Sequence, residues 1–170
     1  MDQPEQFILP DRLAIVGRTV VVEVACAVRY LPRQKIVRAI ETVLAGEAIT
    51  DARVVVVLCD DITIRTINAE FLQHDWATDV ISFALTEAPL DGEVYISVET
   101  AQRQADEYNV SLHNELVRLA VHGTLHLVGY NDTTESERQL MYRIQEQYVQ
   151  LVMRSTATPP STQRPRSSAG

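Results

Sequence analysis

The amino-acid sequence predicts a single α+β domain, in which helices pack on a mixed sheet of about four strands and a zinc site lies at the end of a helix. Short β-branched segments of strand length and longer segments with apolar residues at helical spacing follow one another in mixed order. The chain has 170 residues, of which 46% are hydrophobic and 22% are charged, and this length and composition suit one globular domain.

The N-terminal part of the chain is predicted to hold an irregular lead-in, a strand and a helix. Residues 1–18 mix proline, aspartate and apolar positions, and we expect no regular element there. Residues 19–28 are β-branched and partly alternate, which is typical of a strand. Because proline is accepted in the first turn of a helix, the next helix is expected to open at Pro32, and Gly46 is its expected stop.

The next segment is predicted to hold a buried strand followed by a short helix. Residues 53–59 form a continuous apolar run of strand length, which indicates a strand buried on both faces. Asp60 or Asp61 is expected to cap the helix that follows, since aspartate is favoured at the position before a helix. Residues 72–79 are then expected to form a loop.

Two short strands are predicted after this loop. Residues 80–83 and residues 93–97 are rich in β-branched and aromatic side chains. The segment between them contains a proline and an Asp-Gly pair within residues 86–92, which is a turn or hairpin signal.

Three helices are predicted in the C-terminal half. Residues 99–108 have an amphipathic pattern, and Ser111 is expected to cap a second helix that ends at Gly129. Thr134 and Glu137 have the spacing of a capping box, which indicates the start of the last helix.

The end of the chain is expected to be a disordered tail. Residues 155–170 are rich in serine, threonine and proline and show no apolar periodicity. Residues 19–154 are therefore expected to form the functional domain, between the lead-in of residues 1–18 and this tail.

The net charge and the length of the apolar runs argue against two classes of protein, those that bind duplex nucleic acid through a broad basic face and those that span a membrane. The formal net charge is −8, which argues against a broad basic face for duplex nucleic acid but leaves room for a local groove lined by arginine. No apolar run reaches the ~18 residues of a membrane span, and the acidic N-terminus does not resemble a signal peptide. We therefore expect a cytoplasmic protein with no membrane partner. Cys26 and Cys59 lie in apolar runs and are expected to be buried, reduced thiols.

The segment that carries chemistry has the pattern H-x-x-x-H-x-x-G-x-x-D. His122 and His126 are four residues apart on a predicted helix, so both imidazoles lie on one face. Gly129 allows the chain to turn back, and Asp132 can then return a carboxylate oxygen to the same ion. Three protein ligands leave one position for water, which is typical of a catalytic zinc site. The pattern predicts one Zn²⁺ per chain, held by these three residues.

Two alternatives stay open for this segment. Asp132 can instead be a cap of the last helix, although Thr134 can take that role and leave Asp132 free. The spacing is also that of metzincin peptidases, but Gly123 stands where H-E-x-x-H peptidases carry the glutamate base. Met141 lies inside the last predicted helix and is not placed to form a metzincin-type Met-turn.

The motif resembles the signature of the YbeY family of bacterial endoribonucleases and rRNA maturation factors. The resemblance rests on His122-Gly123-x-x-His126-Leu127-x-Gly129-Tyr130 and on three upstream segments in the order of the family. These segments are Ile67-Asn68-x-x-Phe71, Asp75-x-x-Thr78-Asp79-Val80-Ile81-Ser82-Phe83 and Gly92-Glu93-Val94-Tyr95-Ile96-Ser97. Together they cover most of residues 50–150.

The resemblance implies a zinc-dependent endoribonuclease specific for single strands. It implies action in late rRNA maturation, at the 3′ end of the small-subunit rRNA, and a part in ribosome quality control. The implied partners are rRNA precursor or other single-stranded RNA and the ribosomal small subunit with its associated proteins. The alternatives are a zinc metallopeptidase and a ribosome-associated binding factor with a structural zinc.

The chain departs from the common family pattern at two positions. Asp132 stands where most members carry a third histidine, and a carboxylate remains competent for zinc. Leu72 stands where many members carry an arginine thought to matter for function. Arg118, one helical turn before His122, is a candidate substitute that can stabilise charge on phosphate, but it is equally a solvated charge on the helix.

Three further residues are candidates for the cleft. Thr78 and Ser82 flank a predicted strand and can supply hydroxyl groups, while turn and cap chemistry explains Thr78 equally well. Trp76 can stack on an unpaired base or can anchor the loop by packing.

Overall fold

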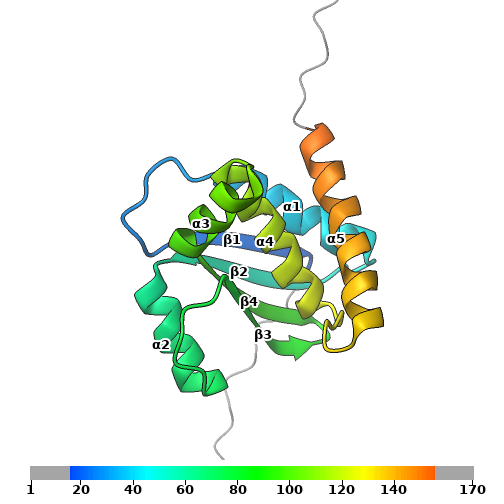
Figure 1. Cartoon of the computed structure of the whole chain (residues 1–170). Coiled ribbons are helices and arrows are strands. Elements are labelled where there is room, and N and C mark those ends of the chain that lie inside the picture. Colours follow the sequence, from blue (N-terminus) through cyan, green and yellow to red (C-terminus); the bar gives the residue numbers. More distant parts are fainter. Residues whose placement is uncertain (1–15, 156–170) are drawn as a thin grey trace, which may run out of the picture.

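Four strands form one mixed sheet that carries helices on both faces (Figure 1). The computed structural model describes residues 16–155, so the predictions for residues 1–15 and 156–170 lie outside the described part of the chain. The elements follow the order β1 (Arg18–Val24), α1 (Arg33–Gly46), β2 (Ala52–Cys59), α2 (Asp61–Leu72), β3 (Val80–Glu87), β4 (Leu90–Ser97), α3 (Val98–Tyr108), α4 (Leu112–Leu127) and α5 (Glu135–Ser155). The predicted α+β class with a four-stranded mixed sheet is confirmed.

The strand order in the sheet is β1-β2-β4-β3. β2 pairs in parallel with β1 on one side and with β4 on the other, whereas β3 runs antiparallel to β4 at the edge. β2 is therefore a central strand, which explains its unbroken run of apolar residues.

The two faces of the sheet are covered unequally. The main core lies between one face and the helices α1, α4 and α5, and it contains Val54, Val56 and Val94. A smaller cluster on the other face joins Cys59, Ile64 and neighbouring half-buried side chains under α2. Figure 1 shows α2 apart from the other helices. The expectation that β2 is buried on both faces is therefore only partly right, because its second face is half-buried.

Helix α4 crosses the sheet closely because Gly123 has no side chain. A Cβ atom at Gly123 would lie 2.5 Å from Cγ1 of Val94 and 2.9 Å from Oγ of Ser82. The Ser82 hydroxyl donates a hydrogen bond of 2.9 Å to the Gly123 carbonyl oxygen. This contact fixes the histidine-bearing helix against the start of β3.

Two predicted boundaries were wrong. The first strand ends at Val24, not at residue 28, because its last ladder bond joins the Ala25 amide to the carbonyl of Leu58 near the end of β2. The turn of the hairpin is at Ala88-Pro89, so the predicted turn over residues 86–92 is too long and both strands extend into it. Gly92 instead lies within β4 beneath Leu127, which approaches too closely to leave room for a side chain.

The caps and cysteines follow the sequence more closely. Asp60 is the cap of α2 and accepts a hydrogen bond of 2.8 Å from the Thr63 amide. Cys59 is buried as expected, whereas Cys26 is only half-buried, and both thiols are free. None of the helices within residues 16–155 combines the length and apolarity needed to cross a bilayer.

Candidate metal centre and adjoining cleft

The three predicted ligands meet at the C-terminal part of α4. The Nε2 atoms of His122 and His126 lie 3.1 Å apart. Oδ2 of Asp132 lies 3.5 Å from Nε2 of His126 and 3.9 Å from Nε2 of His122. Ligands at ~2.0–2.1 Å from one tetrahedral zinc ion lie somewhat more than 3 Å from each other. The group is therefore compact enough to hold one metal ion.

Hydrogen bonds to the other ring nitrogens fix the tautomers of both histidines. Nδ1 of His126 lies 3.0 Å from the Tyr130 carbonyl oxygen, which can only accept, so Nδ1 carries the proton. Nδ1 of His122 lies 2.8 Å from Oε1 of Gln145. The Gln145 amide nitrogen points to Glu146 instead, so the oxygen faces the ring and again accepts. In the neutral form, both Nε2 atoms are then unprotonated.

This arrangement favours a cation between the two rings. Two neutral imidazoles whose Nε2 lone pairs converge at 3.1 Å repel each other unless a positive charge lies between them. Burial lowers the pKa of His122, and this effect outweighs the hydrogen bond that His122 donates to Gln145, which acts in the opposite direction. The ring is therefore kept neutral and ready to bind a metal.

The turn after α4 brings Asp132 to the histidines. Gly129 adopts a left-handed backbone with φ +103°, a conformation that glycine accepts readily. Nη1 of Arg138 donates to the carbonyl oxygens of Asp132 and Thr133 at 3.2 and 2.8 Å, which holds the turn in place. The side chain of Asp132 is about half exposed, at 47%.

The last helix is capped without Asp132. The Thr134 amide donates to Oε2 of Glu137 at 2.8 Å, and the Glu137 amide donates to Oγ1 of Thr134 at 3.3 Å. The predicted capping box is confirmed, and the alternative in which Asp132 caps this helix is wrong.

A cleft of about 370 Å³ adjoins His126. It is lined by Asn68, Leu72, His74, Trp76, Thr78, Val80, Ile81, Ser82 and His126. The structure thus brings the predicted hydroxyl donors, Thr78 and Ser82, into the same cleft as a candidate ligand. Leu72, at the position of the family arginine, lines it with an apolar side chain.

Arg118 forms an ion pair with Glu115 on its own helix. Nε of Arg118 lies 3.0 Å from Oε2 of Glu115, and a second contact joins Nη2 to Oε1. Glu115 is only 1% exposed, so this pair compensates a buried carboxylate. The hydrogen bond that Arg118 donates to Glu115 raises the pKa of Arg118, which keeps the guanidinium charged.

The other two histidines are not part of this group of candidate ligands. His113 contacts the Tyr30 carbonyl oxygen, and His74 stacks on Trp76. Sequence reasoning missed Gln145, which orients His122 from α5. A signal was present, because this polar residue lies four residues after Met141 and three before Tyr148, on the apolar side of the helix.

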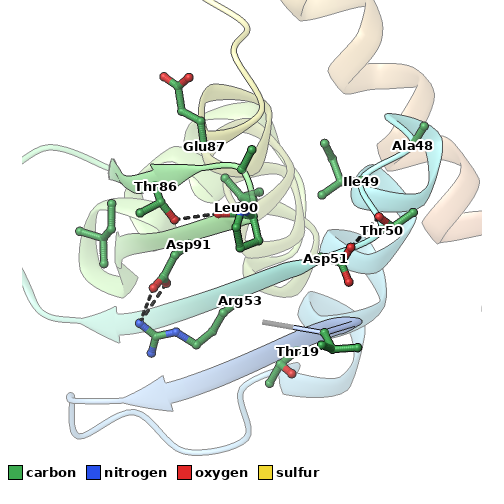
Figure 2. Close-up of a pocket in the computed structure, with 14 residues that line it drawn as sticks. Thr19, Ala48, Ile49, Thr50, Asp51, Arg53, Thr86, Glu87, Leu90 and Asp91 are labelled. Atoms are coloured by element: carbon green, nitrogen blue, oxygen red, sulfur yellow. Dashed lines mark hydrogen bonds and ion pairs between the residues drawn. The ribbon is translucent and has the colours of Figure 1, made fainter. Parts of the chain in front are cut away.

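A larger hollow of about 1090 Å³ lies at the far end of the sheet (Figure 2). The end of β3 and the beginning of β2 and β4 line it, and the ion pair between Arg53 and Asp91 crosses it at 2.9 Å. The cleft beside His126 instead adjoins the beginning of β3. None of the predicted site residues lines the larger hollow.

Fold and site together define an α+β protein with an open, three-ligand candidate metal centre. A family model described as Endoribonuclease YbeY matches residues 27–152. The chain therefore belongs to the endoribonuclease YbeY family, and this membership supports a role as an endoribonuclease, which is a hydrolase.

Relatives of known name agree with this assignment. An Endoribonuclease YbeY from Chloroherpeton thalassium is 42% identical over 120 residues, which cover 70% of this chain and 85% of the relative. One from Chlorobium luteolum is 36% identical over 127 residues, which cover 74% and 93%. A solution structure of a Thermotoga maritima protein matches with a TM-score of 0.58 at 26% identity, and the match covers 84% of this chain and 99% of that one.

Proposed function

We propose that this chain is a zinc-dependent endoribonuclease that cleaves single-stranded RNA during late rRNA maturation. The observation that carries the proposal is the convergence of His122, His126 and Asp132 beside a cleft, with both Nε2 atoms free to bind a metal. Zinc in such a site polarises a phosphoryl oxygen and lowers the pKa of bound water toward ~7.

The protein's own residues prepare this site. Gln145 and the Tyr130 carbonyl hold the imidazoles in the tautomer that presents Nε2, and Arg138 fixes the turn that carries Asp132. Thr78 and Ser82 line the cleft and are proposed to contact the RNA strand. The guanidinium of Arg118 faces Glu115. Its role in stabilising charge on the phosphate therefore stays a prediction from the sequence.

The geometry disfavours the peptidase alternative. The Cβ atom of a glutamate at position 123 would lie 2.5 Å from Cγ1 of Val94 and 2.9 Å from Oγ of Ser82. The packing of the helix on the sheet therefore leaves no room for a glutamate there. Without that glutamate, the helix lacks the general base of H-E-x-x-H peptidases. Hydrolysis of a phosphodiester needs no such base on this helix, because a metal ion held by His122, His126 and Asp132 would itself activate water.

We further propose that the protein works in the cytoplasm on the 3′ end of small-subunit rRNA precursor, with the small subunit and its proteins as partners. The net charge of −8 supports this reliance on partners, because unaided binding to phosphates requires positive charge.

The test combines metal content with RNA cleavage in the same samples. Wild-type protein is expected to carry about one zinc per chain and to cleave single-stranded rRNA fragments. The variants His126→Ala and Asp132→Ala are expected to lose zinc and cleavage together. Zinc without cleavage in wild type would overturn the nuclease proposal, and full zinc in Asp132→Ala would overturn its role as a ligand. A 2′,3′-cyclic phosphate on the product would identify the RNA 2′-hydroxyl as the nucleophile in place of water.

A further inference from the structure

His74 and Trp76 form a stacked aromatic pair at the cleft. Their ring centroids lie 4.4 Å apart and their planes differ by 14°. Trp76 is 57% exposed, although it is among the largest apolar side chains in the protein. Both residues line the cleft that also contains His126 and Ser82. An exposed indole therefore lies beside the candidate metal centre.

Hydrogen bonds from α2 hold the loop that carries this pair in place. The buried Asn68 amide, which is 2% exposed, donates a hydrogen bond of 2.9 Å to the Trp76 carbonyl oxygen. Asp75, which lies between His74 and Trp76 in the sequence, accepts two hydrogen bonds from Arg65, at 2.9 and 3.1 Å. The pair is thus positioned before any ligand binds, which lowers the entropic cost of binding.

Packing does not account for the tryptophan. The small hydrophobic cluster on this face includes the neighbouring Ala77 together with Ile67 and Phe83, but Trp76 belongs to neither cluster of the described residues. Ala77 anchors the loop. The indole has one face against His74, and its exposed surface is available to a planar ligand.

The charges of the protein favour a ligand that is bound through its bases. The net charge is −8. Several arginines are already paired with carboxylates, namely Arg53, Arg65, Arg103, Arg118 and Arg138. Contacts to phosphate are weakened in such a protein, whereas stacking of bases on aromatic side chains contributes affinity that does not depend on net charge.

We propose that the His74–Trp76 pair is a nucleobase subsite, on which an unpaired base of the RNA strand stacks beside the metal centre. The inference rests on the proposed function and specifies how the strand is held. Leu72, half exposed at the same cleft, supplies a further apolar surface for the base. A base in a duplex is stacked between its neighbours and cannot present a free face, so this subsite selects for single strands.

The protein reports on this subsite directly, because Trp76 is its only tryptophan. A single-stranded deoxyribo-oligonucleotide, which lacks the 2′-hydroxyl, is titrated while tryptophan fluorescence is recorded. An abasic oligonucleotide of equal length and charge is the matched ligand. The subsite is supported if the first ligand quenches the fluorescence saturably and the abasic oligonucleotide binds at least about tenfold more weakly. Equal quenching by both would overturn it, because phosphate contacts would then explain binding.

Variants separate the subsite from the metal centre. Trp76→Ala is expected to weaken binding of a fluorescein-labelled single-stranded RNA about tenfold, measured by anisotropy, while zinc content stays at the wild-type level. Trp76→Phe, which keeps an aromatic ring, is expected to lie between Trp76→Ala and wild type. Tyr30→Ala removes an exposed aromatic residue away from the cleft and is the control with unchanged affinity.

The outcomes distinguish the inference from the proposed function. Wild-type affinity in both Trp76 variants, with RNA cleavage intact, would overturn the subsite and leave the nuclease standing. Base-dependent quenching in a protein that cleaves no RNA would support the subsite and overturn the nuclease. Loss of affinity in Tyr30→Ala equal to that in Trp76→Ala would also overturn the subsite.

Discussion

The side-chain oxygen of Gln145 lies 2.8 Å from Nδ1 of His122, and this contact joins the last helix to the candidate metal centre. Gln145 is almost fully buried, at 3% exposure, so no water competes for the imidazole proton. The contact fixes the ring orientation and leaves Nε2 to face His126. Acceptors of this kind raise the basicity of a metal-ligating histidine.

Replacing Gln145 is therefore expected to change zinc affinity. Gln145→Leu removes the acceptor and is expected to weaken zinc binding about 10–100-fold, measured by competition with a chromophoric chelator. Gln145→Glu keeps an acceptor and adds charge, so affinity is expected to be maintained or increased. Gln147→Leu changes an exposed residue of the same helix and is the control. Wild-type affinity in Gln145→Leu would show that His122 does not need this partner.

Gly123 is expected to resist substitution by alanine. A Cβ atom would lie 2.5 Å from Cγ1 of Val94, and such overpacking costs about 1–3 kcal/mol. Alanine gains up to ~1 kcal/mol over glycine in a helix interior, so the free energy of unfolding is expected to fall by at most about 2 kcal/mol. Denaturant unfolding measures this change.

A second substitution tests the cause. In a Val94→Ala background the clash is relieved, so Gly123→Ala is expected to cost much less than in wild type. Equal costs in the two backgrounds would mean that contact with Val94 does not explain the glycine.

Arg118 and Glu115 are expected to act as a structural pair. Arg118→Ala leaves a carboxylate that is 1% exposed without its partner, and such a loss typically costs about 3–5 kcal/mol. Glu115→Gln combined with Arg118→Met removes both charges and is expected to restore most of the stability, measured by chemical unfolding. RNA cleavage is expected to recover with it. A stable double variant that does not cleave RNA would instead support the phosphate-binding role predicted from the sequence.

Asp61 is expected to make the free energy of unfolding depend on pH. Burial alone would raise the pKa of Asp61, but hydrogen bonds from Ser97, Thr100 and Arg103 outweigh it, so the pKa falls below 3.8. A carboxyl with a lowered pKa stabilises the fold above its unfolded pKa, and this contribution disappears as pH falls through the folded pKa. We expect Asp61→Asn to reduce the free energy of unfolding by about 1 kcal/mol at neutral pH.

The difference between Asp61→Asn and wild type is expected to vanish as pH falls below 3.8, in unfolding curves recorded at stepped pH. Asp75→Asn breaks a solvent-exposed pair with Arg65 and is the matched control, with little change in the free energy of unfolding expected. A difference for Asp61→Asn that persists unchanged in acid would contradict the assignment.

The sequence alone determined the local chemistry of this protein. The i, i+4 spacing of His122 and His126, the glycine turn and the capping box at Thr134 each depend on residues close in the chain, so their geometry follows from helix periodicity and backbone preference. The strands were likewise found from apolar runs, although the ends of β1 and of the hairpin were not, because a strand ends where its partner does.

Only the tertiary structure decided which distant residues complete the site. Gln145 reaches His122 across 23 positions, and Ser82 meets Gly123 across 41. It also decided that Trp76 is exposed beside the cleft while Ala77 anchors the loop. The physical reason is that side-chain pairing and burial depend on how helices pack on the sheet, and that packing is set by the whole core and not by any one segment of the chain.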